Sequence, residues 1–258
     1  MKKTIGFTLL GCILTTLVSA QSITNSLKGY YKSTSKNDLY TSFYFNGDGH
    51  ALINDGYTAE YVQVENIVYL FPDKSVFVFE LKDKKLIGKS NWVEKATYKT
   101  STIPDFGEEI TIPQYTIDPN LLYEFYKINY EVGTDQPNFD FYSDYDTYTA
   151  RLKNLCDKGL TTACGGYFGL LYIESLGGID QLLDSNTHAI KPNSEMEKIG
   201  ELMIQKGDIR GYGLLGSYYL AIENDDKAKK YLEKGTELGD IQSATLQFEL
   251  EMDNLNEE

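Results

Sequence analysis

The stretch KGDIRGYGLLGSYYLAIENDDKAKKYLEKGTELGDIQSA, residues 206–244, decides the fold of the C-terminal part of this chain. Its Gly207-Asp208 pair returns as Gly239-Asp240, 32 residues later, and Asn224-Asp225-Asp226 stands between the two pairs. Asp and Asn cap the starts of helices, whereas Gly accepts the left-handed conformation that ends them. The stretch therefore predicts two helices, followed by the start of a second copy of the same unit.

Small and large residues along these two helices predict close packing. The small residues that let the helix axes approach are Gly211, Gly216, Ala228 and Gly235. The large residues that fill the seam between the helices are Leu215, Tyr219, Tyr231 and Leu232. The alternative interpretation is a generic helical bundle with glycine stops.

This pattern resembles the Sel-one-like repeat family, relatives of the tetratricopeptide repeats that stack antiparallel helix pairs into a solenoid. The residues at the family's offsets are Gly207, Gly211, Leu215-Gly216, Tyr219, Lys227-Ala228, Tyr231 and Gly239. An earlier copy is similar at residues 156–172, with its second helix at residues 194–206 and an insertion at residues 176–193. Residues 242–252 would be a half-repeat that caps the array. The resemblance implies a helical-repeat domain over residues 142–258.

The chain has three cysteines, and Cys12 lies in the apolar N-terminal segment. If Cys12 is removed with this segment, Cys156 and Cys164 are left as an even pair. One internal disulfide is then expected in an oxidising compartment. In the cysteine-rich secreted branch of the family, a pair with this spacing staples neighbouring helices, and the resemblance implies the same here. Gly169 and Tyr172 fall one position later than in the family, which leaves the register of this helix open.

Residues 21–100 predict antiparallel β structure. Short aromatic and β-branched runs alternate with turn residues, and they include residues 30–33, 39–45, 57–65, 67–71 and 92–98. Asn46-Gly47-Asp48-Gly49 is a strong hairpin signal between two of these runs. The regular spacing favours a meander that closes into a small barrel or sandwich.

The opening of this segment resembles the small lipocalin-like domains through Gly29-Tyr30, Asp48-Gly49 and Lys85-Leu86. The resemblance implies a barrel that binds a small hydrophobic ligand. The candidate lining residues are Tyr44, Phe77, Phe79 and Trp92. The alternative is that these aromatic side chains simply fill a small barrel.

Residues 101–141 hold four of the six prolines and are interpreted as a connecting segment with a short helix over residues 121–130. The whole sequence thus predicts a two-domain α+β fold. Its N-terminal domain is a small antiparallel β-barrel or sandwich over residues 21–100, and its C-terminal domain is an α/α helical-repeat solenoid over residues 142–258.

Residues 1–20 have the features of a secretory signal peptide. Lys2 and Lys3 precede an apolar run that is too short to span a bilayer, and Val18-Ser19-Ala20 offers small residues for cleavage before Gln21. The alternative is that Cys12 belongs to a lipobox and carries a lipid anchor. The sequence predicts a periplasmic or secreted protein with no transmembrane segment after cleavage.

The chain is acidic, with a formal net charge of −14 at pH 7, and loss of Lys2 and Lys3 with the signal makes it more negative. Such a surface repels the phosphates of nucleic acids. It favours a cationic protein partner. The alternative is that the acidic surface only keeps the protein soluble.

No catalytic residue, cofactor or metal ion is expected. Asp144-Tyr145-Asp146-Thr147 fits the DxDxT pattern of aspartate-nucleophile phosphotransferases, but the buried strand and parallel sheet that this motif needs are not indicated. Asp144 and Asp146 are therefore assigned to the start of a helix. His50 and His188 are interpreted as solvated loop residues without the partners that a general base needs. These two histidines and one cysteine pair are too few for a metal site.

The sequence favours an exported protein–protein interaction module over an enzyme. Tyrosine brings a large contact area at a small entropic cost. The candidate partner-binding residues are Tyr167, Tyr172, His188, Tyr212 and Tyr218. Secreted members of the resembled family include immunity proteins that neutralise delivered toxins, and the resemblance implies this function. The alternative function is the binding of a small hydrophobic ligand by the N-terminal domain.

Overall fold

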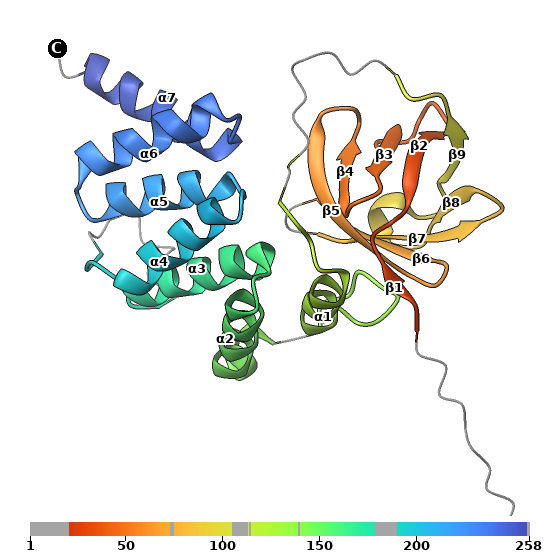
Figure 1. Cartoon of the computed structure of the whole chain (residues 1–258), viewed down its shortest axis with the longest axis horizontal. Helices are drawn as coiled ribbons and strands as arrows, with labels where there is room; N and C mark the ends of the chain where they lie inside the picture. The colour runs from red at the N-terminus through yellow and green to blue at the C-terminus, as the bar shows by residue number, and fades with distance from the viewer. Residues whose placement is uncertain are drawn as a thin grey trace, which may run out of the picture.

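A computed structural model describes residues 21–72, 75–104, 113, 115–138, 140–178 and 190–256. An N-terminal β-barrel lies beside seven described helices, so the predicted α+β architecture is confirmed (Figure 1). The predicted signal segment with Cys12, and His188 in the predicted insertion, lie outside the described residues.

The barrel is a closed antiparallel meander. Its strands are β1 (Ile23–Thr24), β2 (Lys28–Ser33), β3 (Ser42–Asn46), β4 (His50–Ile53), β5 (Tyr57–Val64), β6 (Ile67–Phe71), β7 (Phe77–Lys82), β8 (Lys85–Gly88) and β9 (Thr97–Ser101). Each strand from β2 to β9 pairs with the next in the chain, and β2 pairs with β9, which closes a barrel of eight strands. The short β1 pairs with the last two residues of β5, Gln63 and Val64, and is not one of the eight strands that close the barrel. Closure leaves no open edge within the eight strands, which resolves the choice between barrel and sandwich.

Aromatic rings fill the inside of the barrel. Along β3, the predicted alternation sends Phe43 and Phe45 into the interior, where neither is exposed to solvent. The ring of Phe43 meets that of Tyr98 edge-on with centroids 4.9 Å apart, and Phe45 meets Tyr61 in the same way at 4.9 Å. An eight-stranded barrel has room for little more than such a side-chain core.

Two of the candidate ligand-lining residues are therefore misplaced. Phe77 and Phe79 do belong to the interior cluster, but Tyr44 lies on the opposite side of β3 from Phe43 and Phe45. Trp92 lies on the short 3₁₀ helix Asn91–Val93 between β8 and β9 and is exposed. The prediction that all four side chains line one cavity is wrong, because the strand alternation and the turn at Trp92 point them in different directions.

The helices begin where their capping residues lie. They are α1 (Pro119–Asn129), α2 (Phe141–Asp157), α3 (Thr161–Ser175), α4 (Ser194–Gln205), α5 (Arg210–Ala221), α6 (Asp225–Glu237) and α7 (Ile241–Asn256). Asp118 accepts hydrogen bonds from the backbone N–H groups of Asn120 and Leu121, so α1 starts at Pro119, two residues earlier than predicted. Asn224 caps α6 as predicted, by accepting a hydrogen bond from the N–H of Lys227.

From α2 onward each helix packs against the next, and α5 also contacts both α3 and α7. The helices α3, α5 and α7 thus form one layer of the array, and α4 and α6 lie against it. This arrangement keeps the two helices of the quoted stretch, α5 and α6, in direct contact, as the small residues predicted.

The same backbone corner ends α2, α4 and α6, and it recurs with Gly177 at the end of α3 and with Glu223 at the end of α5. Gly159, Gly207 and Gly239 all adopt a left-handed backbone, with φ of 96°, 86° and 88°. In each case the N–H of the following residue bonds to the carbonyl five residues back, at distances of 2.9–3.1 Å: Leu160 to Leu155, Asp208 to Met203 and Asp240 to Gly235. This is the Schellman motif, which reverses the chain between one helix and the next.

Two glycines let neighbouring helices touch. A Cβ atom added at Gly200 of α4 would lie 2.4 Å from the side chain of Leu215 in α5, and one added at Gly216 of α5 would lie 2.2 Å from Leu232 in α6. Such distances are far inside van der Waals contact. A leucine of one helix therefore occupies the space of a missing side chain on the helix before it.

We expect Gly216→Ala to lower the free energy of unfolding by about 1–3 kcal/mol, because Leu232 is fully buried and cannot move aside. Gly169 of α3 is the matched control, since a Cβ atom there meets nothing within 4 Å. Gly169→Ala should raise the stability by about 0.5–1 kcal/mol through helix propensity. Urea denaturation of both variants measures the difference, and equal effects would show that the helices are not in close contact at Gly216.

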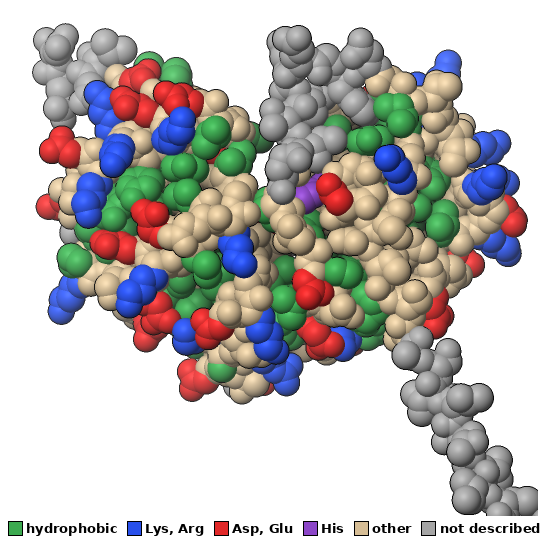
Figure 2. Space-filling view, viewed as in Figure 1, with side chains coloured by type: hydrophobic (Ala, Val, Ile, Leu, Met, Phe, Trp, Pro, Cys, Tyr) green, Lys and Arg blue, Asp and Glu red, His purple; other side chains and the backbone are tan. Residues whose placement is uncertain are grey.

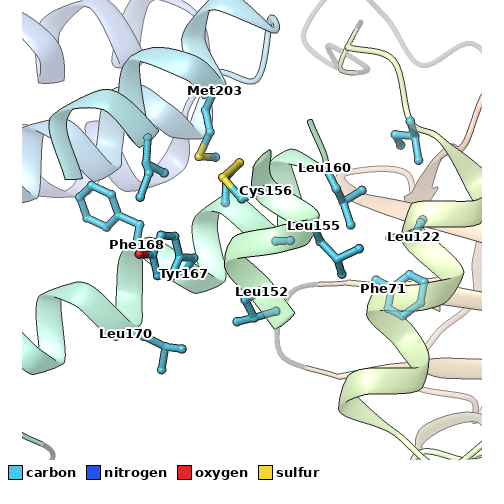
Figure 3. Packing of buried hydrophobic residues seen from close by; sticks show 14 of the residues in the cluster. Phe71, Leu122, Leu152, Leu155, Cys156, Leu160, Tyr167, Phe168, Leu170 and Met203 are labelled. Atoms are coloured by element: carbon cyan, nitrogen blue, oxygen red, sulfur yellow. A yellow bond between two sulfur atoms is a disulfide. The ribbon is translucent and has the colours of Figure 1, made fainter. Parts of the chain in front are cut away.

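A disulfide joins Cys156 of α2 to Cys164 of α3, with Cα atoms 4.5 Å apart. Both residues are buried, and Cys156 lies among the packed side chains between α2, α3 and α4 (Figure 3). The bridge connects consecutive helices, as the resemblance to the cysteine-rich repeats implies. Closing this short loop contributes about 2–3 kcal/mol to stability in the chain-entropy account.

One hydrophobic cluster runs from the outside of the barrel into the helical array. Tyr69 and Phe71 of β6 pack against α1, where the rings of Tyr69 and Tyr126 have centroids 4.2 Å apart. Leu155 and Leu160 then fill the space between α1 and the array (Figure 3). The segment predicted as a connector thus contributes α1 to the core, and the two parts of the molecule share a continuous apolar contact.

Candidate functional site

A buried carboxylate of the barrel collects donors from three distant segments. Glu60 lies on β5 and is buried. Its Oε1 accepts hydrogen bonds from the hydroxyl of Tyr115 and from Nη2 of Arg210, the latter at 2.8 Å, and its Oε2 accepts one from the hydroxyl of Thr162. Together with Asp208, these residues form what we call the Glu60 cluster. It ties β5 to the connecting segment, to α3 and to α5.

Arg210 is the first residue of α5 and also binds Asp208, which is fully buried. Its Nε lies 2.9 Å from Oδ1 of Asp208 and its Nη2 lies 2.6 Å from Oδ2, a two-point contact that fixes the guanidinium plane. The same Nη2 lies 3.0 Å from the hydroxyl of Tyr115. Burial and the negative charge of Glu60 raise the pKa of Tyr115 well above 10, so its hydroxyl stays protonated and donates.

His50 adjoins the cluster and corrects one prediction. It is the cross-strand neighbour of Glu60, and its ring meets that of Tyr115 edge-on at 4.7 Å. It was predicted to be a solvated loop residue, but β4 starts at His50 and buries it. Its Nδ1 lies 2.9 Å from Oδ1 of Asp48, and this hydrogen bond lowers the pKa of Asp48 despite the opposing effect of burial. Within the described part of the chain, His50 Nε2 is buried without a hydrogen-bond partner.

The Glu60 cluster is built to hold two parts together. Its acceptor oxygens are taken by donors of the same chain, so they are not free to bind a ligand. In the residues that the structure describes, no group of three His, Cys, Asp or Glu side chains is placed to hold a metal ion. The cluster therefore sets the position of the N-terminal end of α5 relative to the barrel.

The surface over α4, α5 and α6 carries an open groove of about 450 Å³. Its lining residues are Glu201, Ile204, Tyr212, Lys230, Tyr231, Glu233, Lys234 and Glu237. The hydroxyl of Tyr231 donates to Glu201, and its ring stacks on Tyr219 with centroids 5.4 Å apart. An adjoining hollow of about 520 Å³ follows α4 and shares Glu201. Figure 2 shows the helical part as a surface where hydrophobic side chains alternate with charges of both signs.

The structure separates the predicted partner-binding tyrosines. Tyr212 lines the groove, and Tyr172 is half-buried against the core. Tyr167 and Tyr218 are buried, so their prediction as partner contacts is wrong. Tyr167 donates to Glu195 at 2.9 Å, and Tyr218 accepts from the backbone N–H of Asn193 at 2.7 Å, which makes both of them internal supports of α4.

Tyr231 is the groove residue that the sequence interpretation missed. It was assigned to the seam between helices, where part of its ring does lie. The sequence carries a signal, because Lys227 and Lys234 stand four residues before and three residues after Tyr231, on the same side of the helix, and a tyrosine between exposed lysines borders solvent.

Across the described residues no helix has both the length and the apolar character required to cross a membrane. Comparison of the chain with protein-family models, with curated proteins and with solved structures found no significant match. The architecture alone classifies the protein: a closed eight-stranded antiparallel barrel fixed to an array of helices, with an open mixed-charge groove on the array.

Proposed function

We propose that this protein is an exported protein-binding module whose helical repeats form a short solenoid that presents the recognition surface. The observation that carries the proposal is the groove lined by Tyr212 and Tyr231, with lysine and glutamate side chains along its rim. Aromatic rings framed by charges are typical of the energetically important centres of protein interfaces.

An open groove suits a protein partner better than a small molecule. Small ligands usually bind in enclosed, mostly apolar pockets that bury most of the ligand surface. The barrel, the other candidate for a small ligand, has its interior filled by the rings of Phe43, Phe45 and Phe79. Because the Glu60 cluster and the shared core fix the array on the barrel, the groove needs little ordering when it binds.

The partner class proposed here is a cationic protein, and a delivered toxin neutralised by this chain as an immunity protein is the most concrete case. The resemblance to the Sel-one-like repeats supports it, as does the formal charge of −14. Electrostatic attraction between opposite charges speeds association and weakens as salt rises. The internal disulfide supports export to the periplasm or the exterior, with a lipid anchor at Cys12 as the alternative mode of retention.

Site-specific photo-cross-linking in cells that express the chain tests the groove. A photoreactive residue at Lys230, which is exposed on the rim, should capture one partner, and the adduct should decrease when Tyr231→Ser is added. Lys99, exposed on β9 of the barrel, is the matched control position and should give no specific adduct. Equal cross-linking from the two positions would remove the groove as the recognition surface.

A further inference from the structure

The 32-residue spacing between Gly207 and Gly239 matches each residue of α7 to one of α5, and this shows which face of α7 is left uncovered. The corners at Gly207 and Gly239 have the same backbone geometry, so α7 follows its corner as α5 follows the earlier one. With the spacing of 32 residues, Phe248 of α7 stands where Gly216 stands in α5. Gly216 is the point at which Leu232 of α6 packs onto α5. The equivalent face of α7 meets no later helix in the part of the chain that the structure describes.

That face of α7 is apolar and exposed. Ile241, Phe248 and Met252 have exposed fractions of 73%, 63% and 43%, and their spacings of seven and four residues place them on one side of a helix. Leu238, just before the helix, extends this line of side chains, which we call the α7 stripe. The opposite side of α7 faces α6, where Ser243 is buried against Asp240. The exposed side chains are therefore not needed to hold α7 in place.

The charges on α7 beside the stripe are of one sign. The helix carries no lysine or arginine, whereas Glu249 and Glu251 flank the stripe on its two sides. Glu237, before the helix, is already paired with Lys234 at 2.8 Å. A second copy of the same helix would bring like charges together, which opposes association. A helix with lysine or arginine beside its own apolar line would complement the stripe in both charge and hydrophobicity.

We infer that the α7 stripe binds an amphipathic helix of another protein, with lysine or arginine flanking its apolar side. The bound helix takes the place relative to α7 that α6 takes relative to α5. The inference rests on the proposed protein-binding function but concerns a surface separate from the groove at Tyr231, and it specifies the chemistry of the partner.

The test uses three synthetic helical peptides and the signal-free chain. One peptide has an apolar line at positions i, i+4, i+7 and i+11 with lysine flanks, the second replaces the lysines by glutamate, and the third carries a central proline that breaks the helix. We expect the lysine peptide to bind in fluorescence anisotropy, and the other two to bind at least about tenfold more weakly.

Two matched variants identify the surface. Phe248→Ser should weaken binding of the lysine peptide about tenfold or more, whereas Tyr57→Ser should leave it unchanged. Tyr57 is 67% exposed on β5 of the barrel, so the same substitution removes a similarly exposed aromatic ring without a change in charge. Circular dichroism melts verify that both variants stay folded.

Equal binding by the Phe248→Ser variant would overturn the inference, because it would mean attraction to the acidic surface in general. Equal binding of the glutamate peptide would overturn the charge argument. A concentration-dependent dimer in sedimentation that Phe248→Ser abolishes would identify a second copy as the occupant instead. Since none of these outcomes involves the cross-linking position at Lys230, failure here leaves the proposed function of the groove to be judged by its own experiment.

Discussion

Raising the pH above 10 should unfold this protein cooperatively before its buried tyrosines ionise. Tyr61, Tyr69 and Tyr98 are almost completely buried, and burial raises the pKa of each of them well above 10. Tyr115 behaves in the same way, with the charge of Glu60 as a second cause. A phenol whose pKa is higher in the folded state stabilises the fold fully below pH 10, and this stability is lost as the pH rises toward the folded pKa.

The slope of this loss is large because several tyrosines act together. Above pH 10 the unfolded chain releases a proton from each phenol while the folded chain keeps it, which costs about 1.4 kcal/mol per pH unit for each group. Four such groups lower the free energy of unfolding by about 6 kcal/mol per pH unit, against a typical total of about 5–15 kcal/mol. The transition should therefore fall within about one to three pH units above 10.

Absorbance at 295 nm, which reports phenolate, and far-ultraviolet circular dichroism should be followed together as the pH rises. Tyrosines that are accessible to water should ionise first, without loss of structure. The remaining absorbance should appear only with the loss of the dichroism signal. Tyr98→Phe keeps the ring but removes the phenol, so the slope of stability against pH should become shallower by about 1.4 kcal/mol per pH unit. Full ionisation with an intact dichroism spectrum would contradict this account.

Local sequence signals predicted the elements of the fold well. The alternation in residues 39–45 and the Asn46-Gly47-Asp48-Gly49 turn gave the β3–β4 hairpin, and the Gly207-Asp208 and Asn224 signals gave α5 and α6. These succeed because strand alternation, turns and caps depend on residues close in sequence. The start of α1 was missed by two residues because the cap at Asp118 was not recognised.

Local sequence signals could not predict the contact between the barrel and the helical array. Glu60 reads as one of many carboxylates on a polar surface, and Arg210 as an ordinary residue in the first turn of a helix. They are 150 positions apart, and only the closed barrel and the stacked helices bring them together. The burial of His50, Tyr167 and Tyr218 was missed for the same reason, since each is covered by a segment that is distant in sequence.

Glu60→Ala should destabilise the protein by about 3 kcal/mol, which corresponds to a fall in melting temperature of about 6–12 °C for a chain of this size. The substitution leaves the hydroxyls of Tyr115 and Thr162 without their acceptor and removes one partner of Arg210. The loss stays below the upper range for a broken buried ion pair, because the Arg210 side chain is 44% exposed and keeps Asp208.

Glu80 provides the matched control on the same barrel. Its carboxylate lies 2.6 Å from Lys89, a shorter ion pair than that of Glu60 with Arg210, but both side chains are accessible to water. Exposed pairs gain little because water screens them. Glu80→Ala should therefore leave the urea midpoint unchanged. If the two variants lose the same stability, burial at Glu60 is not what makes its contacts valuable.

A double-mutant cycle separates the stability that the Glu60–Arg210 ion pair contributes from the stability that the surrounding packing contributes. Glu60→Gln and Arg210→Met each remove one charge with little change in volume, and their combined effect should fall short of the sum of the single effects by about 1–2 kcal/mol. The deficit measures the direct coupling between β5 and the start of α5. Additive losses would mean that the shared apolar core around Tyr69 and Tyr126 alone positions the array on the barrel. In that case α1 would hold the groove-bearing helices in position on the barrel, because the remaining aromatic contacts between the two parts are made by α1.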